Sequence, residues 1–280
     1  MHDSLAQHRK QLGQTGITVS PIGLGTVKFG RNQKVKYPSP FDLPGENELA
    51  DFLELAKSLG INTLDTAPAY GLSEERLGRL LNGQRSEWTI IGKAGENFVD
   101  GESCFDFSAD GVEKSVNESL ERLKTDYIDV LLIHSDGRDT EILNDDALIR
   151  RLDDLKSQNL VKAHGISTKT VEGGLYALEK LDCVMATYHP AYTDEKPVLD
   201  TAKKMQKGVI LKKALASGHV KDIAPEGVDP VEYSLSHAFA EDSVASVIIG
   251  TISRDHMRHN VKAALKALQS PILQQAESRG

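Results

Sequence analysis

Short apolar runs alternate with amphipathic stretches along most of the chain. Between the runs, apolar residues recur at three- and four-residue steps, which is the spacing of a helix that buries one face. Such stripes cover 49–59, 112–123 and 257–268. The runs themselves have the length of buried strands; they are Pro21–Thr26, Ile61–Thr66, Trp88–Lys93, Ile128–His134, Lys162–Ser167, Cys183–Tyr188, Gly208–Lys213 and Ala245–Gly250.

Capping residues indicate where several helices begin and end. Gly60 follows the first stripe as a helix C-cap, and Ser108 precedes the second as an N-cap. Asp229 and Pro230 combine a capping side chain with proline at the first helical position. Helices are therefore expected between the apolar runs.

Eight strands, each followed by a helical stretch, predict an α/β fold of the (β/α)8 TIM barrel type, with an open doubly wound sheet as the alternative. Leu12–Val19 has Thr15-Gly16 between two short runs, which predicts a β-hairpin that closes the bottom of the barrel. The proline-containing stretch 31–45 is expected to be a long loop after the first strand. The 280 residues are interpreted as one domain, 1–280.

Composition points to an ordinary globular protein with a small-molecule partner. The net charge is −8, from 33 basic and 41 acidic residues, which argues against nucleic acid or an anionic membrane as the main partner. Cys104 and Cys183 provide neither a disulfide framework nor metal-ligand spacing. The chain shows no apolar signal segment and no stretch of membrane-spanning length, so a cytoplasmic location is expected. A monomer and a homodimer both remain open.

Four polar residues stand at or just after consecutive strand ends. Asp65, Lys93 and His134 end the second, third and fourth runs, and Tyr70 lies in the loop after the second. Alone, each has a structural interpretation: Asp65 braces a loop, Tyr70 packs as an aromatic residue, and His134 is a core histidine. Because the carboxyl ends of barrel strands meet at one face, however, the four together predict a reactive site.

The residue types define the chemistry of that site. A nearby ammonium stabilises a phenolate, so Lys93 makes Tyr70 a stronger acid, while His134 orients or shares the proton. Asp65 holds Lys93 charged and in place. The histidines show no zinc-like spacing, and neither a GxGxxG turn nor a Walker A motif is present, so no metal is expected.

The segment LDTAPAYGLSEERLG, followed by the lysine of IIGKAG and the histidine of YIDVLLIHSDG, resembles the aldo-keto reductase family. The resemblance runs over nearly the whole chain. It implies a (β/α)8 barrel that binds a nicotinamide cofactor without a Rossmann motif. It also implies a catalytic tetrad of Asp65, Tyr70, Lys93 and His134, with Tyr70 as general acid.

The resemblance further implies a set of cofactor contacts: Gly25, Thr26, Asp65, Ser167, Thr168, Met185, Lys212, Leu215, Ser217, Gly250, Thr251, Ser253, Arg254, Arg258 and Asn260. Several depart from the family pattern. Thr168 stands where asparagine is usual, Met185 where glutamine is frequent, and Lys212 where many members stack an aromatic ring on the nicotinamide. Gly250 stands where some members carry lysine.

Ser253, Arg254 and Arg258 lie at the start of the last helix, and a helix N-terminus with arginines suits a phosphate. NADP(H) is therefore the expected cofactor, with NAD as the less favoured alternative. The expected reaction is hydride transfer to or from a small aldehyde, ketone or sugar, in a pocket walled by the loop VKFGRNQKVKYPSPFDLPGEN. Two alternatives stay open: a barrel that binds cofactor in an accessory role with little turnover, and a Schiff-base lyase acting through Lys93.

Overall fold

The computed structural model describes residues 4–35, 40–216 and 224–269, and its central feature is a closed barrel of parallel strands. Each predicted run overlaps one barrel strand, which extends beyond the run by at most one residue, and the last strand pairs with the first, which excludes the open sheet. The strands are β3 (Ile22–Gly25), β4 (Thr63–Asp65), β5 (Thr89–Ala94), β8 (Ile128–His134), β9 (Val161–Ser167), β10 (Cys183–Thr187), β11 (Gly208–Lys212) and β12 (Val244–Ile249).

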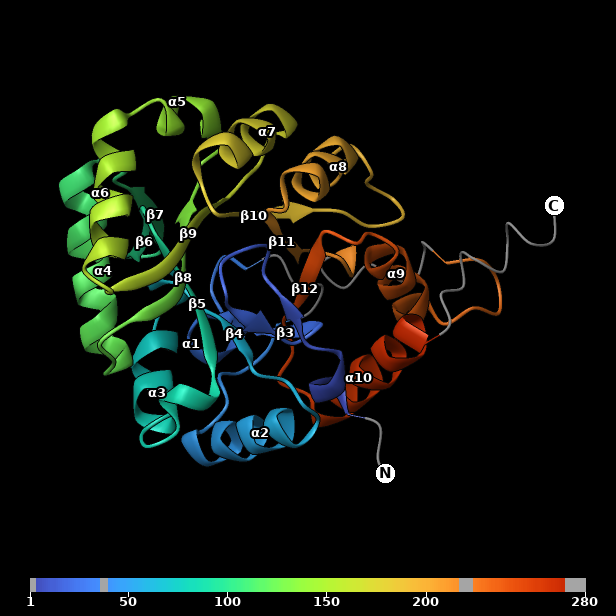
Figure 1. Ribbon diagram of the computed structural model, residues 1–280. Coiled ribbons are helices and arrows are strands. Elements are labelled where there is room, and N and C mark those ends of the chain that lie inside the picture. The colour runs from blue at the N-terminus through green and yellow to red at the C-terminus, as the bar shows by residue number, and fades with distance from the viewer. Residues whose placement is uncertain (1–3, 36–39, 217–223, 270–280) are drawn as a thin grey trace.

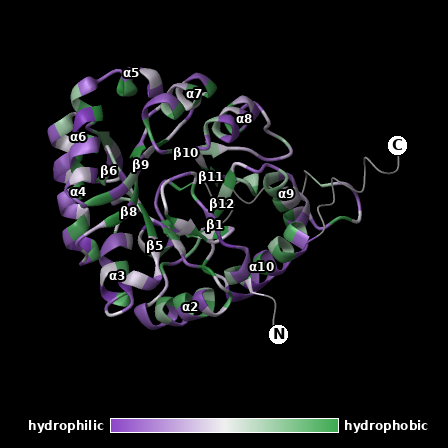
Figure 2. Cartoon of the chain, in the orientation of Figure 1, coloured by the Kyte–Doolittle hydropathy of each residue, from purple (hydrophilic) through white to green (hydrophobic). Residues whose placement is uncertain are grey.

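Helices surround the barrel as an outer ring (Figure 1). Their apolar faces pack on the strands and their polar faces point outward, as the colouring of Figure 2 shows. The helices are α1 (Val27–Gly30), α2 (Glu46–Ser58), α3 (Ser73–Leu80), α4 (Ala109–Leu123), α5 (Asp139–Leu143), α6 (Asp146–Ser157), α7 (Val171–Lys180), α8 (Lys196–Met205), α9 (Pro230–Phe239) and α10 (Arg254–Gln269). Short 3-10 helices cover Leu5–His8, Pro68–Tyr70 and Arg85–Glu87.

The two predicted N-caps are confirmed, whereas the C-cap of α2 is Leu59, one residue before the predicted Gly60. The Ser108 side chain accepts a hydrogen bond from the backbone N–H of Gly111, and the Asp229 side chain accepts one from Glu232. Gly60 follows α2 with φ of +89°, a conformation that favours glycine.

The N-terminal hairpin exists, but its strands differ from the prediction. They are β1 (Lys10–Gln11) and β2 (Thr18–Val19), so the first strand lies before Leu12 rather than within Leu12–Val19. The backbone N–H of Leu12 donates to Ile17 O at 2.8 Å, which makes the segment between the strands one compact turn. Burial explains why Leu12 leaves the strand.

Leu12 closes the lower end of the barrel. Its side chain is fully buried and packs with Ile17, Val19 and the inward-facing residues of the barrel. It also contacts Gly208, the first residue of β11, where a side chain would collide with it. The hairpin crosses the centre of the ring in Figure 1, as expected for a plug at the N-terminal ends of the strands.

A second hairpin was not predicted. β6 (Glu96–Val99) and β7 (Glu102–Phe105) leave the barrel directly after β5 and pair antiparallel. Asp100 and Gly101 form the turn with φ of +52° and +82°, the signs of a type I′ hairpin. This hairpin stands over the C-terminal end of the barrel, beside the strand ends that carry the candidate site.

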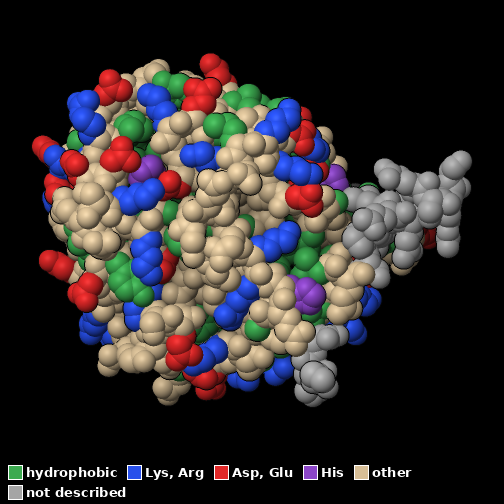
Figure 3. Space-filling view, in the orientation of Figure 1, with side chains coloured by type: hydrophobic (Ala, Val, Ile, Leu, Met, Phe, Trp, Pro, Cys, Tyr) green, Lys and Arg blue, Asp and Glu red, His purple; other side chains and the backbone are tan. Residues whose placement is uncertain are grey.

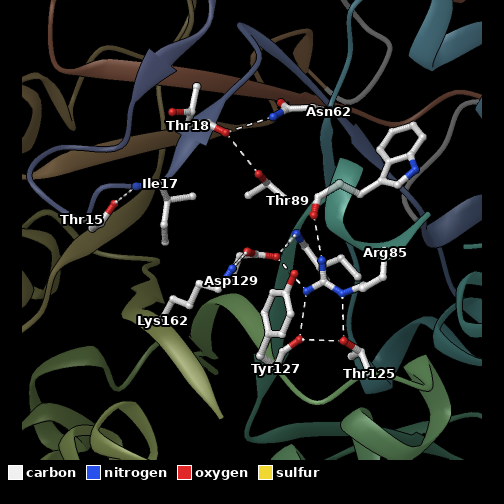
Figure 4. Close-up of polar contacts among 12 residues, drawn as sticks. Thr15, Ile17, Thr18, Asn62, Arg85, Thr89, Thr125, Tyr127, Asp129 and Lys162 are labelled. Carbon is white, nitrogen blue, oxygen red and sulfur yellow. Dashed lines mark hydrogen bonds and ion pairs between the residues drawn. The ribbon is translucent and has the colours of Figure 1, made fainter. Parts of the chain in front are cut away.

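A network of charged residues lies at the opposite, N-terminal end of the barrel, around the start of β8; Figure 4 shows its side chains. Asp129 is 5% exposed and accepts hydrogen bonds from Arg85 at 2.8 Å, from Lys162 at 2.8 Å and from the backbone N–H of Ile90 at 2.9 Å. Both cations also pack on the ring of Tyr127. The carboxylate therefore ties three neighbouring strands together without facing the candidate site.

We expect Asp129→Ala to lower the free energy of unfolding by about 3 kcal/mol, because it leaves two partly buried cations without their shared carboxylate. Urea denaturation measures the change, with the exposed Asp154→Ala as the matched control. A loss no larger than that of the control would show that the network contributes nothing to stability.

Lysine and arginine side chains are interspersed with aspartate and glutamate on the face shown in Figure 3. Over the residues that the structure describes, no helix has both the length and the apolar character needed to cross a membrane.

Candidate active site

The floor of the site is a buried ion pair between two neighbouring strands. β4 and β5 run parallel with Asp65 opposite Ile91, so Lys93 lies two residues further along the adjacent strand. The Lys93 ammonium contacts the Asp65 carboxylate and donates to Thr66 O at 3.1 Å. Lys93 is 2% exposed and Asp65 4% exposed, so the pair is shielded from water. Such a pair fixes a positive charge inside the barrel mouth.

Tyr70 lies above this pair. It ends the 3-10 helix that follows β4, which turns its side chain back over the strand ends. The hydroxyl donates to Asp65 Oδ2 at 3.4 Å, and the Lys93 ammonium lies 4.8 Å from the centre of the phenol ring. The phenol is thus beside the cation that would stabilise its ionised form.

His134 completes the group from the next strand. Its ring lies 6.2 Å from that of Tyr70, edge to face at 86°. The structure therefore brings together all four residues that the sequence singles out, three from neighbouring strands and Tyr70 from the 3-10 helix that follows β4.

Glu96 is a fifth residue of the site, and it was not predicted from the sequence. Its Oε2 lies 2.8 Å from Nδ1 of His134, although off the ideal direction of a ring N–H hydrogen bond. Burial raises the pKa of Glu96, but the contact with His134 and the hydrogen bond from Ser103 outweigh it and bring the pKa to about 2. Burial lowers the pKa of His134, against the opposing effect of Glu96. At neutral pH we therefore take Glu96 as ionised and His134 as a neutral imidazole.

The ends of β9 and β11 form the neighbouring part of the mouth. Ser167 pairs with His134 in register, and Lys212 pairs with Thr187. The Lys212 ammonium donates to Ser167 Oγ at 2.8 Å and to Thr168 O at 2.5 Å. The hydroxyl of Ser167, one of the cofactor contacts that the resemblance implies, thus accepts a hydrogen bond from a lysine.

Two titratable groups near Ser167 are perturbed. Burial, with a smaller effect of Lys213, lowers the pKa of Lys212 to about 8. Burial raises the pKa of Glu195 to about 7, and Lys212 partly opposes that rise. Glu195 was not predicted, because it lies eight residues beyond the end of β10 and reaches Lys212 only through the fold.

Other predicted contacts have structural partners. Thr26 is buried; its hydroxyl donates to Asp65 O at 2.9 Å and lies 2.7 Å from Ser73 Oγ. Thr168 and Met185 are also buried, and the Thr168 hydroxyl donates to Met185 O at 3.4 Å. These side chains therefore hold the strand ends in place.

The start of α10 lies at the far side of the mouth. The Ser253 hydroxyl accepts from the backbone N–H of His256 at 3.3 Å, as expected of an N-cap, and Arg254 lies 3.7 Å from the exposed Asp51. A cavity of about 450 Å³ opens beside Arg254. The Thr251 hydroxyl accepts from the backbone N–H of Ser253 at 3.1 Å. The other predicted contacts are placed as follows: Gly25 is buried and pairs with Asp65, Arg258 is exposed, Asn260 is 7% exposed, Gly250 follows β12, Leu215 packs on the core, and Ser217 lies outside the described residues.

The loop after β3 forms a wall beside Tyr70, in part as predicted. The Arg31 guanidinium stacks on the Phe98 ring at 3.4 Å and donates to Ala69 O at 3.0 Å. Lys34 and Glu102 form an ion pair at 2.8 Å. The loop is therefore fastened to the β6–β7 hairpin; residues 36–39 lie outside the described part.

Comparisons with known proteins agree with this arrangement. A model described as the aldo/keto reductase family matches residues 21–224. A putative aldo-keto reductase from Pseudomonas aeruginosa has a solved structure with a TM-score of 0.86 and 48% identity, covering 95% of this chain and 98% of that one. L-galactose dehydrogenase from Arabidopsis thaliana is 29% identical over 300 residues, 93% of this chain and 89% of that protein. D-threo-aldose 1-dehydrogenase from a Pseudomonas species is 27% identical over 285 residues, 92% of this chain and 83% of that protein.

Proposed function

Because the chain belongs to the aldo/keto reductase family, we propose that it transfers hydride between NADP(H) and the carbonyl or alcohol carbon of a small aldehyde, ketone or sugar. The observation that carries this proposal is the buried Asp65–Lys93 pair beneath the hydroxyl of Tyr70. A phenol held over a desolvated ammonium is built to give up or accept a proton.

In the direction of reduction, Tyr70 donates its hydroxyl proton to the substrate oxygen as that oxygen gains negative charge. The phenolate that remains is stabilised by the Lys93 ammonium, and Asp65 holds that ammonium in place. The pair is shielded from water, so its charges act more strongly on Tyr70 than they would on an exposed side chain. In the reverse direction, the same phenolate accepts the proton of an alcohol.

The residues at the mouth fit a nicotinamide dinucleotide. Ser167 Oγ and the Lys212 ammonium supply polar groups for a carboxamide next to His134, and the aliphatic part of Lys212 can cover one face of a ring. The N-terminus of α10, with Arg254 and Arg258, suits the phosphates. When bound there, the cofactor supplies or accepts the hydride.

Two relatives suggest where to look for a substrate. One is named an L-galactose dehydrogenase and the other a D-threo-aldose 1-dehydrogenase, so sugars belong in any substrate panel for this chain. Spectrophotometry of reduced nicotinamide, with NADPH or NADH and a panel of aldehydes, ketones and aldoses, tests the proposal. Tight NADPH binding without turnover on the whole panel would instead favour the accessory role.

The Schiff-base alternative receives no support from the geometry. A lysine that condenses with a carbonyl must present a free amine. Lys93 instead contacts Asp65 with 1% of its side chain exposed. Borohydride treatment with a carbonyl substrate is therefore expected to leave Lys93 unmodified.

Replacing Arg254 tests the preference for NADP(H). We expect Arg254→Ala to raise the Kd of NADPH about tenfold while changing the Kd of NADH little, because only NADPH carries the additional phosphate. Fluorescence titration of each cofactor measures the change, and Arg150→Ala, on the exposed face of α6, is the matched control. An equal change for both cofactors would remove Arg254 from phosphate recognition.

A further inference from the structure

Glu96 is an acidic residue of the site that the proton chemistry of Tyr70 leaves without a role. Its side chain is only 14% exposed although it starts a surface hairpin. One carboxylate oxygen accepts a hydrogen bond from Ser103 Oγ at 2.7 Å, and the other lies 2.8 Å from Nδ1 of His134. The carboxylate is therefore held between the hairpin and the imidazole.

The fold fixes this contact through strand register. β5 and β8 pair with Ala94 opposite Ile133, so the residues that follow them on the two strands lie side by side. Gly95 then turns the chain with φ of +99°, and a side chain there would meet the Phe107 ring at 2.6 Å. The carbonyl oxygen of Gly95 accepts a hydrogen bond from the backbone N–H of Asp106 at 2.9 Å, which closes the base of the hairpin. Glu96 thus has little freedom to leave His134.

Charges around the pair determine which partner holds the proton. Burial, together with the charges of Lys93 and Lys212, disfavours a positive charge on His134 and outweighs the opposing effect of Glu96, so the pKa of His134 is lowered. The positive charges of Arg31 and Lys169 act on Glu96 and favour its ionised form. An ionised carboxylate can only accept a hydrogen bond, so a neutral imidazole beside it keeps its hydrogen on Nδ1.

We propose that Glu96 is a positioning residue that holds the hydrogen of His134 on Nδ1 and leaves Nε2 as a hydrogen-bond acceptor in the ring that faces Tyr70. What this means for substrate binding rests on the proposed function. Nε2 of His134, as an acceptor, suits the hydroxyl of an alcohol or a sugar, whereas Tyr70 supplies the hydrogen-bond donor for a carbonyl oxygen. Glu96 itself acts only through His134.

Long-range ¹H–¹⁵N NMR of the imidazole nitrogens tests this directly, on the full-length protein without cofactor. The signals of His134 are assigned by their loss in His134→Asn. The wild-type protein is expected to show the Nδ1–H form of His134. In Glu96→Gln, that preference should be lost and His134 should titrate at a lower pH, because the negative charge that favours the imidazolium is gone. Glu102→Gln, which removes a charge from the same hairpin away from His134, is the matched control.

Kinetics provide a second measurement. Glu96→Gln is expected to lower kcat about tenfold and to move the pH profile of kcat, with the Kd of NADPH unchanged. Should Glu96→Gln fail to fold, Ser103→Ala retains the charge but loosens the carboxylate, and the Nδ1–H preference is then expected to weaken.

A wild-type His134 with its hydrogen on Nε2, or a Glu96→Gln protein in which His134 titrates as in the wild type, would overturn the inference. The NMR result requires neither cofactor nor turnover. The inference about His134 can therefore be confirmed or contradicted independently of the proposed reductase activity.

Discussion

Tyr70→Phe is expected to lower kcat/KM for carbonyl reduction by about a thousandfold or more, because the substrate oxygen loses its proton donor. The ring and its packing against Lys93 and His134 remain, so the Kd of NADPH should stay nearly unchanged. Steady-state kinetics and fluorescence titration measure the two quantities on the same preparation.

Tyr176→Phe is the matched control for that variant. Its hydroxyl donates to Asn144 on the outer helices, away from the strand ends, so activity should be retained. If Tyr70→Phe turned over at a rate close to that of Tyr176→Phe, then Tyr70 would not be the general acid.

Lys93→Met has the second large effect, and it affects both activity and stability. Without the ammonium, the phenolate of Tyr70 loses its stabilising charge, and we expect kcat to fall at least a hundredfold. The Asp65 carboxylate is left buried without its cation, so the free energy of unfolding should fall by about 3 kcal/mol. Single-turnover kinetics and urea denaturation measure the two losses.

A double variant separates these effects. Lys93→Met combined with Asp65→Asn removes the unpaired buried charge, so stability should recover while activity stays low. Lys114→Met, at an exposed position on α4, controls for the loss of a lysine. Activity that recovered together with stability would mean that Lys93 serves the fold alone.

The barrel and its reactive residues were accessible from the sequence because their signals are local. Strands buried on both faces appear as continuous apolar runs, and each of the eight predicted runs overlaps a barrel strand. Asp65, Lys93 and His134 end such runs, and closure of the barrel brings those ends to one edge. Only the pairing of β12 with β3 was needed to decide between barrel and open sheet.

Glu96 and Lys212 show what the sequence could not provide. Glu96 meets His134 because β5 and β8 pair in one register, and that contact spans 38 residues of chain. The Asp100-Gly101 turn was a usable signal for the hairpin, but not for where its first side chain points. Lys212 was singled out as a departure from the family pattern, yet its hydrogen bond to Ser167 depends on how β9, β10 and β11 pack.

The N-terminal hairpin was misplaced for a related reason. Thr15-Gly16 correctly indicated a turn, but the apolar Leu12 was assigned to a strand. In the structure, Leu12 leaves the strand because the open end of the barrel buries it completely. Tertiary burial overrides local pattern here.

The central claim is that hydride moves between a nicotinamide cofactor and substrate carbon at the site of Tyr70. The most direct measurement uses NADPH deuterated at the transferable position of the nicotinamide, incubated with the wild-type protein and an aldose or aldehyde, followed by mass spectrometry of the product. The account predicts an alcohol that carries one deuterium on the former carbonyl carbon, with no such product from Tyr70→Phe. An unlabelled product, or equal labelling by both proteins, would contradict it.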